Sequence, residues 1–159
     1  FKKGNVEKIP YPDSFFDVVY SCWVVEHLEN PQFFFEEAHR VLKKEGILIL
    51  WVPNVKSFMG VITKILSNEN KVRVLSLLSK KTEDDVSHQI CHYKANSVSS
   101  LDYLMKYNFE RIFMKRLDTP HYYRQYFFLT YLWYLKHQIT KNNILNFSWP
   151  SLYVEYKKI

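Results

Sequence analysis

The sequence predicts an α/β fold built around a parallel sheet. Two short apolar runs, residues 16–20 and 47–52, have the length and the valine, isoleucine and aromatic content of buried strands. Between them, apolar residues recur at helical spacing. A strand, a helix and a strand joined by short connections form a right-handed crossover, which makes the two strands parallel. Strands that are apolar on both faces are typical of sheets covered by helices on each side.

The connecting helix is well marked at both ends. Pro31 suits its first turn, and Phe34, Ala38 and Val41 form its apolar stripe. Gly46 follows as the expected left-handed residue that ends the helix. The second strand therefore begins directly after this glycine.

The rest of the chain continues the alternation of helices and strands. We expect a single domain over residues 1–159, with a helical insertion at about 55–87. Beyond the insertion, the patterns predict a helix at 97–107, a strand at 109–117, a helix at 122–139 and a strand at 152–157.

Composition narrows the classes of partner. Apolar residues make up 47% of the chain, which is enough for a buried core. The net charge of +6 is carried mostly by lysine pairs scattered along the chain, such as Lys43-Lys44 and Lys80-Lys81. Scattered pairs are typical of solvated surface, so we expect no nucleic-acid partner. A nucleic-acid binder stays the weakest alternative, and salt-dependent affinity would reveal it.

Two cysteines, Cys22 and Cys91, do not make a disulfide framework. Reduced thiols suit a cytosolic protein, and we expect a cytoplasmic location. No apolar run is long enough to span a bilayer, which leaves peripheral contact with a membrane open. Four aromatic residues could line an acceptor pocket, lie on a membrane or pack in the core: Tyr122, Tyr123, Tyr126 and Phe127.

The expected chemistry lies where the two parallel strands end. In such sheets, ligands bind beyond the carboxyl ends of the strands, which points to Ser21–His27 and to Pro53-Asn54. His27 is the candidate general base because imidazole titrates near neutral pH; a structural role at a helical turn is the alternative. Cys22 has no neighbouring base in the sequence that would make it a nucleophile.

Metal and phosphate sites are not expected. His88 and His92 lie four residues apart beside Cys91, but no further ligand cluster accompanies them. The chain holds only three glycines, so it cannot form a Gly-rich nucleotide loop.

Several short motifs occur in a recognisable order. They are Gly4-Asn5-Val6-Glu7, Ile9-Pro10-Tyr11, Phe16-Asp17-Val18-Val19, Glu26-His27-Leu28 and Arg40-Val41-Leu42-Lys43-Lys44-Glu45-Gly46. The region from Gly4 to Asn54 resembles the second half of class I S-adenosylmethionine-dependent methyltransferases of the small-molecule type. A looser likeness continues through His88–Leu101, Asn108-Phe109-Glu110 and Tyr153–Lys157.

The resemblance implies a Rossmann-like methyltransferase sheet with helices on both faces. The chain would hold the end of strand three and strands four to seven, while strands one and two and the Gly-rich loop would be missing. The cofactor would be S-adenosylmethionine. Its adenine would lie at Asn5, Val6 and Glu7, where the family has an aspartate in place of Asn5, and its methionine end would lie against Ser21, Cys22 and Trp23.

We therefore expect S-adenosylmethionine-dependent methyl transfer to a small-molecule or lipid-like acceptor, with the chain as a fragment that is inactive alone. The isolated 159 residues should bind the cofactor weakly or not at all. The alternative is a non-catalytic, truncated domain that acts as a binding module, for instance for the missing N-terminal half.

Overall fold

The computed structural model describes residues 3–57, 60–61, 91–118, 127–141 and 149–159. The chain divides into two compact units. Unit 1 comprises residues 1–53, 91–115 and 152–159, and unit 2 comprises residues 54–90 and 116–151. The insertion predicted at about 55–87 falls almost entirely outside the described residues, so it stays a prediction, as does the single domain.

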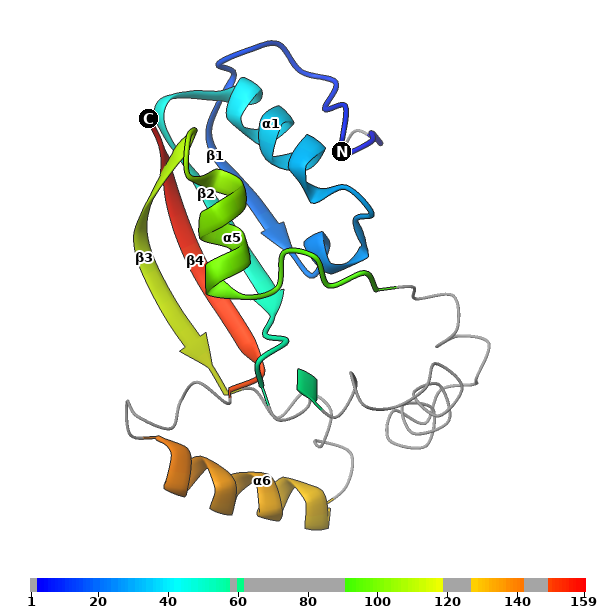
Figure 1. Cartoon of the computed structure of the whole chain (residues 1–159), viewed down its shortest axis with the longest axis vertical. Helices are drawn as coiled ribbons and strands as arrows, with labels where there is room; N and C mark the ends of the chain where they lie inside the picture. Colours follow the sequence, from blue (N-terminus) through cyan, green and yellow to red (C-terminus); the bar gives the residue numbers. More distant parts are fainter. Residues whose placement is uncertain (1–2, 58–59, 62–90, 119–126, 142–148) are drawn as a thin grey trace. The chain divides into compact units, whose positions relative to one another are not determined.

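A four-stranded sheet lies almost wholly in unit 1. Its order is β1 (Phe16–Cys22), β2 (Leu42–Pro53), β4 (Ser151–Lys158) and β3 (Phe109–Leu117). Strands β1 and β2 are parallel, with Tyr20 opposite Ile49, so the predicted crossover is confirmed. Strand β4 lies between β2 and β3 and runs in the opposite direction to both, which makes the sheet mixed (Figure 1). No strand precedes β1 among the residues described.

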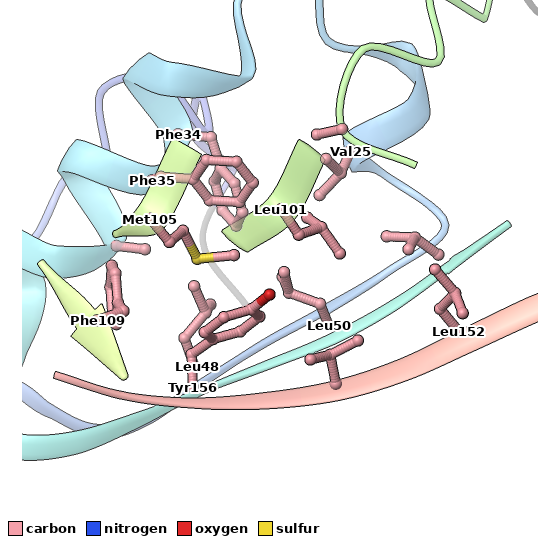
Figure 2. Close-up of a cluster of buried hydrophobic side chains, with 14 of the residues drawn as sticks. Val25, Phe34, Phe35, Leu48, Leu50, Leu101, Met105, Phe109, Leu152 and Tyr156 are labelled. Atoms are coloured by element: carbon pink, nitrogen blue, oxygen red, sulfur yellow. The ribbon is translucent and has the colours of Figure 1, made fainter. Parts of the chain in front are cut away.

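Two helices cover one face of this sheet. Helix α1 (Pro31–Val41) and helix α5 (Val98–Met105) contribute Phe35 and Leu101 to a cluster with Leu50 of β2 and Tyr156 of β4 (Figure 2). Ser97 caps α5 through a reciprocal pair of hydrogen bonds with Ser100. The apolar core is therefore the layer between these helices and the sheet.

The other face of the sheet is also apolar. Side chains alternate along a strand, so Val18 and Tyr20 of β1 lie on the face opposite Val19, and both are about half exposed. Their β2 neighbours Ile47 and Ile49 are half-buried. The apolar pattern on both faces of the strands predicted helices on both sides of the sheet. Within unit 1, however, α1 and α5 both lie on the first face.

The prediction that Gly46 ends the helix in a left-handed conformation is wrong. Helix α1 ends at Val41, and the left-handed residue is Glu45, with φ 65°. Gly46 is needed for close approach instead. A Cβ there would come within 2.9 Å of the Lys43 carbonyl oxygen and 3.2 Å of the Asp17 carbonyl oxygen.

Unit 2 contains helix α6 (Phe127–Thr140), which overlaps the helix predicted at 122–139. Tyr122, Tyr123 and Tyr126 lie outside the described residues, and the Phe127 side chain is not described. In the part of the chain that the structure covers, no helix is both long and apolar enough to cross a membrane.

Candidate functional site at the carboxyl ends of β1 and β2

The chain leaves β1 through a tight turn beside the end of β2. The Trp23 N–H donates to the Trp51 carbonyl oxygen at 2.9 Å, which extends the parallel ladder by one bond. Trp23 takes a left-handed conformation, with φ 55°, at a cost of roughly 1–2 kcal/mol for a non-glycine residue. Strained residues of this kind concentrate at functional sites. The turn leads directly into the short helix η1 (Val25–His27).

A distant segment packs against this helix. The N–H groups of His92 and Tyr93 both donate to the Glu26 carbonyl oxygen, at 2.7 and 3.2 Å. Further along, the Asn96 side-chain amide donates to the carbonyl oxygen of Pro53, at the end of β2. Residues 91–96 thereby join the ends of both parallel strands. No motif in the sequence assigns this role to them, because the contacts join residues that lie 43 to 67 positions apart in the chain.

His27 lies between a thiol and a carboxylate. Its Nδ1 is 3.5 Å from Cys91 Sγ, and its Nε2 is 4.0 Å from Glu26 Oε1. The His27 side chain is 40% exposed, so it is accessible to a ligand. Burial raises the pKa of Cys91, although a hydrogen bond with Tyr93 opposes the shift. The thiol is therefore neutral at neutral pH, and His27 is the stronger candidate for moving a proton.

Glu26 is the group that sequence reasoning missed. Its side chain is only 3% exposed, and Oε2 has no hydrogen-bond partner among the described residues. Burial raises its pKa, and the hydrogen bonding and His27 charge that oppose this are weaker. Ser21 Oγ and Asn96 Oδ1 are likewise buried without partners. Buried oxygens in this state are rare in folded proteins and call for a ligand or water. In the sequence, Glu26 is marked only by its place beside His27 in the Glu-His-Leu motif, and its burial is not evident there.

The residues predicted to line the methionine end do not share one face. Ser21 and Cys22 are consecutive in β1, so their side chains point to opposite sides of the sheet. Ser21 is buried opposite Leu50, on the side of the helices. Cys22 lies on the other side, where it hydrogen-bonds Tyr20 and raises the pKa of that phenol. A ligand on one side of the sheet can therefore contact the side chain of Ser21 or that of Cys22, but not both.

The residues predicted to hold adenine form a small turn before β1. Asn5 Oδ1 accepts a hydrogen bond from the Glu7 N–H at 2.9 Å, and the Lys8 N–H donates to the Asn5 carbonyl oxygen. This is the turn geometry that asparagine favours. Val6 packs against the apolar core, which ties the turn to the sheet.

Arg40 of α1 holds the loop that follows this turn. Its guanidinium donates to the carbonyl oxygens of Ile9 and Tyr11 and to the carboxylates of Asp13 and Glu37, at 2.7–2.9 Å. Glu37 Oε2 in turn accepts from the Ile9 N–H at 2.8 Å. Hydrogen bonds from Arg40 are the main cause that lowers the pKa of Glu37. Arg40 of the Arg-Val-Leu motif thus acts as a clamp on the loop between the predicted adenine turn and β1.

Other site types find less support. Among the described residues, no three His, Cys, Asp or Glu side chains gather as metal ligands, and His88 lies outside them. A cavity of about 370 Å³ lies beside the amino end of α1, away from Glu26 and His27. It is lined by Glu29, Asn30, Pro31, Gln32, Lys94, Ser100, Tyr103 and Leu104.

Comparisons with known proteins concern the family and the fold. A family model described as a methyltransferase domain matches residues 1–50. A Mycolicibacterium smegmatis protein named as a probable S-adenosylmethionine-dependent methyltransferase is 37% identical over 57 residues. That match covers 36% of this chain but only 22% of the relative's length.

Solved structures with similar folds cover nearly the whole chain. An S-adenosylmethionine-dependent methyltransferase of Thermotoga maritima aligns with a TM-score of 0.59 and 19% identity, over 99% of this chain and 62% of its own. A protein described as a [4+2]-cyclase aligns with a TM-score of 0.54 and 16% identity, over 99% and 55%. At these identities the likeness concerns the fold alone, and the second example means that the fold by itself does not fix the reaction.

Proposed function

We propose that the chain belongs to the class I S-adenosylmethionine-dependent methyltransferases, and that the protein containing it transfers a methyl group from S-adenosylmethionine to a small-molecule or lipid-like acceptor. The observation that carries this proposal is the pair of parallel strands β1 and β2, whose carboxyl ends bring together a buried carboxyl, an accessible imidazole and unpartnered oxygens. Polar groups gathered at this edge of a parallel sheet are where such folds bind ligands.

The described residues fit one part of a cofactor site. The Asn5–Glu7 turn would hold the adenine, and Asn5 Oδ1 retains a second lone pair while it accepts from Glu7. Arg40 keeps the following loop in place through its bonds to Ile9 and Tyr11. Ser21 and the backbone at Trp23 would face the methionine end. When bound, the cofactor supplies an activated methyl group on a sulfonium.

Methyl transfer is an in-line displacement, so the protein must mainly place the acceptor behind the methyl carbon. A base is needed only when the acceptor loses a proton. His27 takes this role, because it is accessible and lies 3.5 Å from a thiol that burial keeps neutral. Glu26 Oε1, 4.0 Å away, would stabilise the imidazolium that forms.

The test uses the product of the complete gene that encodes this chain. Titration calorimetry with S-adenosylhomocysteine measures cofactor binding, and transfer of a radiolabelled methyl group to a set of candidate acceptors measures activity. His27→Ala should lower the transfer rate by about 100-fold or more while cofactor affinity stays within about twofold. The matched control is His92→Ala, because His92 is exposed and contributes its backbone N–H.

The alternative is a non-catalytic binding module. It is favoured by the short stretch shared with the curated relative, 57 residues. A complete gene product that binds no S-adenosylhomocysteine and transfers no methyl group would replace the enzymatic proposal with this one. Transfer that is equal in the wild type and in His27→Ala would leave methyl transfer intact but remove His27 as the base.

A further inference from the structure

Helix α6 carries its apolar stripe on the outside. Phe128, Leu132, Leu135 and Ile139 follow each other at spacings of four, three and four residues, which places them on one face of the helix. All four are between 41% and 67% exposed. A helix at the surface of a globular protein normally turns such a stripe toward the core.

Another face of α6 carries hydrogen-bonding side chains and packs against its own unit. Three side chains within about one turn donate to one carboxylate: Trp133 Nε1 and Lys136 Nζ to Asp118 Oδ1, at 3.0 and 2.8 Å, and His137 Nδ1 to Asp118 Oδ2 at 2.8 Å. The Asp118 side chain is completely buried. The His137 ring stacks between Trp133 and Trp149, with centroids 5.4 and 5.3 Å away.

These contacts fix which side of the helix faces outward. Turning the apolar stripe inward would remove the donors from Asp118 and leave a buried carboxylate without a partner, which is among the most costly changes in a folded protein. The Trp149 indole N–H also donates to Thr140 Oγ1, which holds the end of the helix in the same orientation. The exposed stripe is therefore a fixed feature of unit 2, and surfaces of this kind mark interaction sites.

The residues around the stripe indicate what covers it. Tyr131 and Tyr134 flank the stripe and are about half exposed. Tyrosine combines an apolar ring with a polar hydroxyl and is enriched where membranes meet water. Helix α6 contains no Asp or Glu, Lys141 follows its last residue, and the chain as a whole carries a net charge of +6. An apolar face bordered by tyrosine and lysine complements an anionic lipid surface.

A second copy of the chain suits the stripe less well. Paired helices usually border their apolar seam with charges of both signs, which attract across the interface. Residues 127–141 contain no acidic side chain, and Lys136 is already paired with Asp118, so this helix of a second copy offers Lys141 no opposite charge. The helix has 14 residues and is therefore about 21 Å long, enough to lie along a membrane surface.

We propose that α6 binds the surface of an anionic membrane and inserts Phe128, Leu132, Leu135 and Ile139 among the lipids. This inference does not depend on methyl transfer, because membrane binding requires neither the cofactor nor the strand-end site. If the proposed function also holds, the same surface would bring the enzyme to a lipid-like acceptor.

The experiment is flotation of the complete protein with two kinds of vesicle, phosphatidylcholine alone and phosphatidylcholine mixed with phosphatidylglycerol, without cofactor. We expect binding to the anionic vesicles, weakened by salt. Phe128→Ser combined with Ile139→Ser should lower the partition coefficient at least tenfold. Lys141→Glu, which leaves the stripe intact, should lower it about tenfold on anionic vesicles only.

The matched control is Tyr107→Ser combined with Ile159→Ser, which removes an aromatic and an isoleucine of similar exposure from unit 1. It should bind vesicles like the wild type, and circular dichroism checks that every variant is folded. A wild-type protein that floats with neither vesicle overturns the proposal, as does a double variant at α6 that binds normally. Equal binding to both vesicle types overturns the anionic specificity. A wild-type dimer that Phe128→Ser with Ile139→Ser converts to a monomer, without vesicle binding, assigns the stripe to a second copy instead.

Discussion

Two glutamates in unit 1 have opposite surroundings: Glu26 lies in η1, before helix α1, and Glu37 lies within α1. Glu37 of α1 is partly exposed, and both of its oxygens accept hydrogen bonds, from Arg40 and from the Ile9 N–H. Glu26 of η1 is almost fully buried, and one of its oxygens has no partner among the described residues. The first carboxylate is satisfied and holds a loop in place. The second is buried without a full set of partners, which makes it a candidate for contact with a ligand.

The largest expected effect concerns Arg40, which binds Glu37 and holds the loop before β1. Arg40→Ala should weaken S-adenosylhomocysteine binding by the complete protein about 10- to 100-fold, because the loop that follows the predicted adenine turn would lose its position. Arg40→Lys should recover only part of the affinity, since an ammonium cannot reproduce the forked contacts with Ile9, Tyr11 and Glu37.

Calorimetry measures the affinity, and limited proteolysis before β1 measures release of the loop without any ligand. Lys43→Ala is the control, because its ion pair with Asp17 is solvent-exposed and should change neither readout. If the loop stays protected in Arg40→Ala, Arg40 does not position it.

Removing the two glutamates should change stability in opposite directions. Glu26→Met replaces a buried, incompletely paired carboxyl with an apolar side chain of similar length, and we expect the free energy of unfolding to rise by about 1 kcal/mol. Glu37→Met removes acceptors from Arg40 and Ile9 and should lower it by about 1–2 kcal/mol. Urea unfolding at pH 7 measures both. Two losses of similar size would mean that Glu26 is as structural as Glu37.

The smallest effect is on the pH dependence of stability. The pKa of Glu37 is lowered, chiefly by hydrogen bonding with Arg40, so its contribution is present above its ordinary value of about 4.5 and is lost as pH falls. The pKa of Glu26 is raised by burial, so stability is highest below about 4.5 and falls as pH rises through the folded-state value. The free energies of unfolding of the wild type and of Glu26→Gln, measured between pH 4 and pH 8, should therefore approach each other toward low pH.

Compared with Glu37→Gln, the wild type should be the more stable protein at pH 7, and the two should approach each other only as the pH falls below about 4.5. With Glu26→Gln, the variant should be the more stable one there. Parallel curves for Glu26→Gln across the whole range would contradict the raised pKa of Glu26.

The local elements could be predicted because their signals lie within a few residues. The apolar runs predicted β1 and β2, the short crossover required them to be parallel, and Ser97 marked the start of α5. The end of α1 was missed because a glycine after a helix usually serves as its left-handed cap, whereas Glu45 takes that conformation here and Gly46 is required by a backbone contact with Asp17. His27 was chosen from the sequence for its ordinary chemistry, whereas its neighbour Glu26 became a candidate only through its burial.

The sequence by itself determined the order of helices and strands, the parallel pair and the likeness to methyltransferases, because periodicity and short motifs are local properties of the chain. Tertiary structure alone decided which polar groups are satisfied. Cys91 contacts His27, which lies 64 residues earlier in the chain. Asp118 binds polar side chains of α6 and so holds that face of the helix toward unit 2, which leaves the apolar stripe exposed. Desolvation and hydrogen bonding depend on neighbours in space, and neighbours distant in sequence leave no periodic signal.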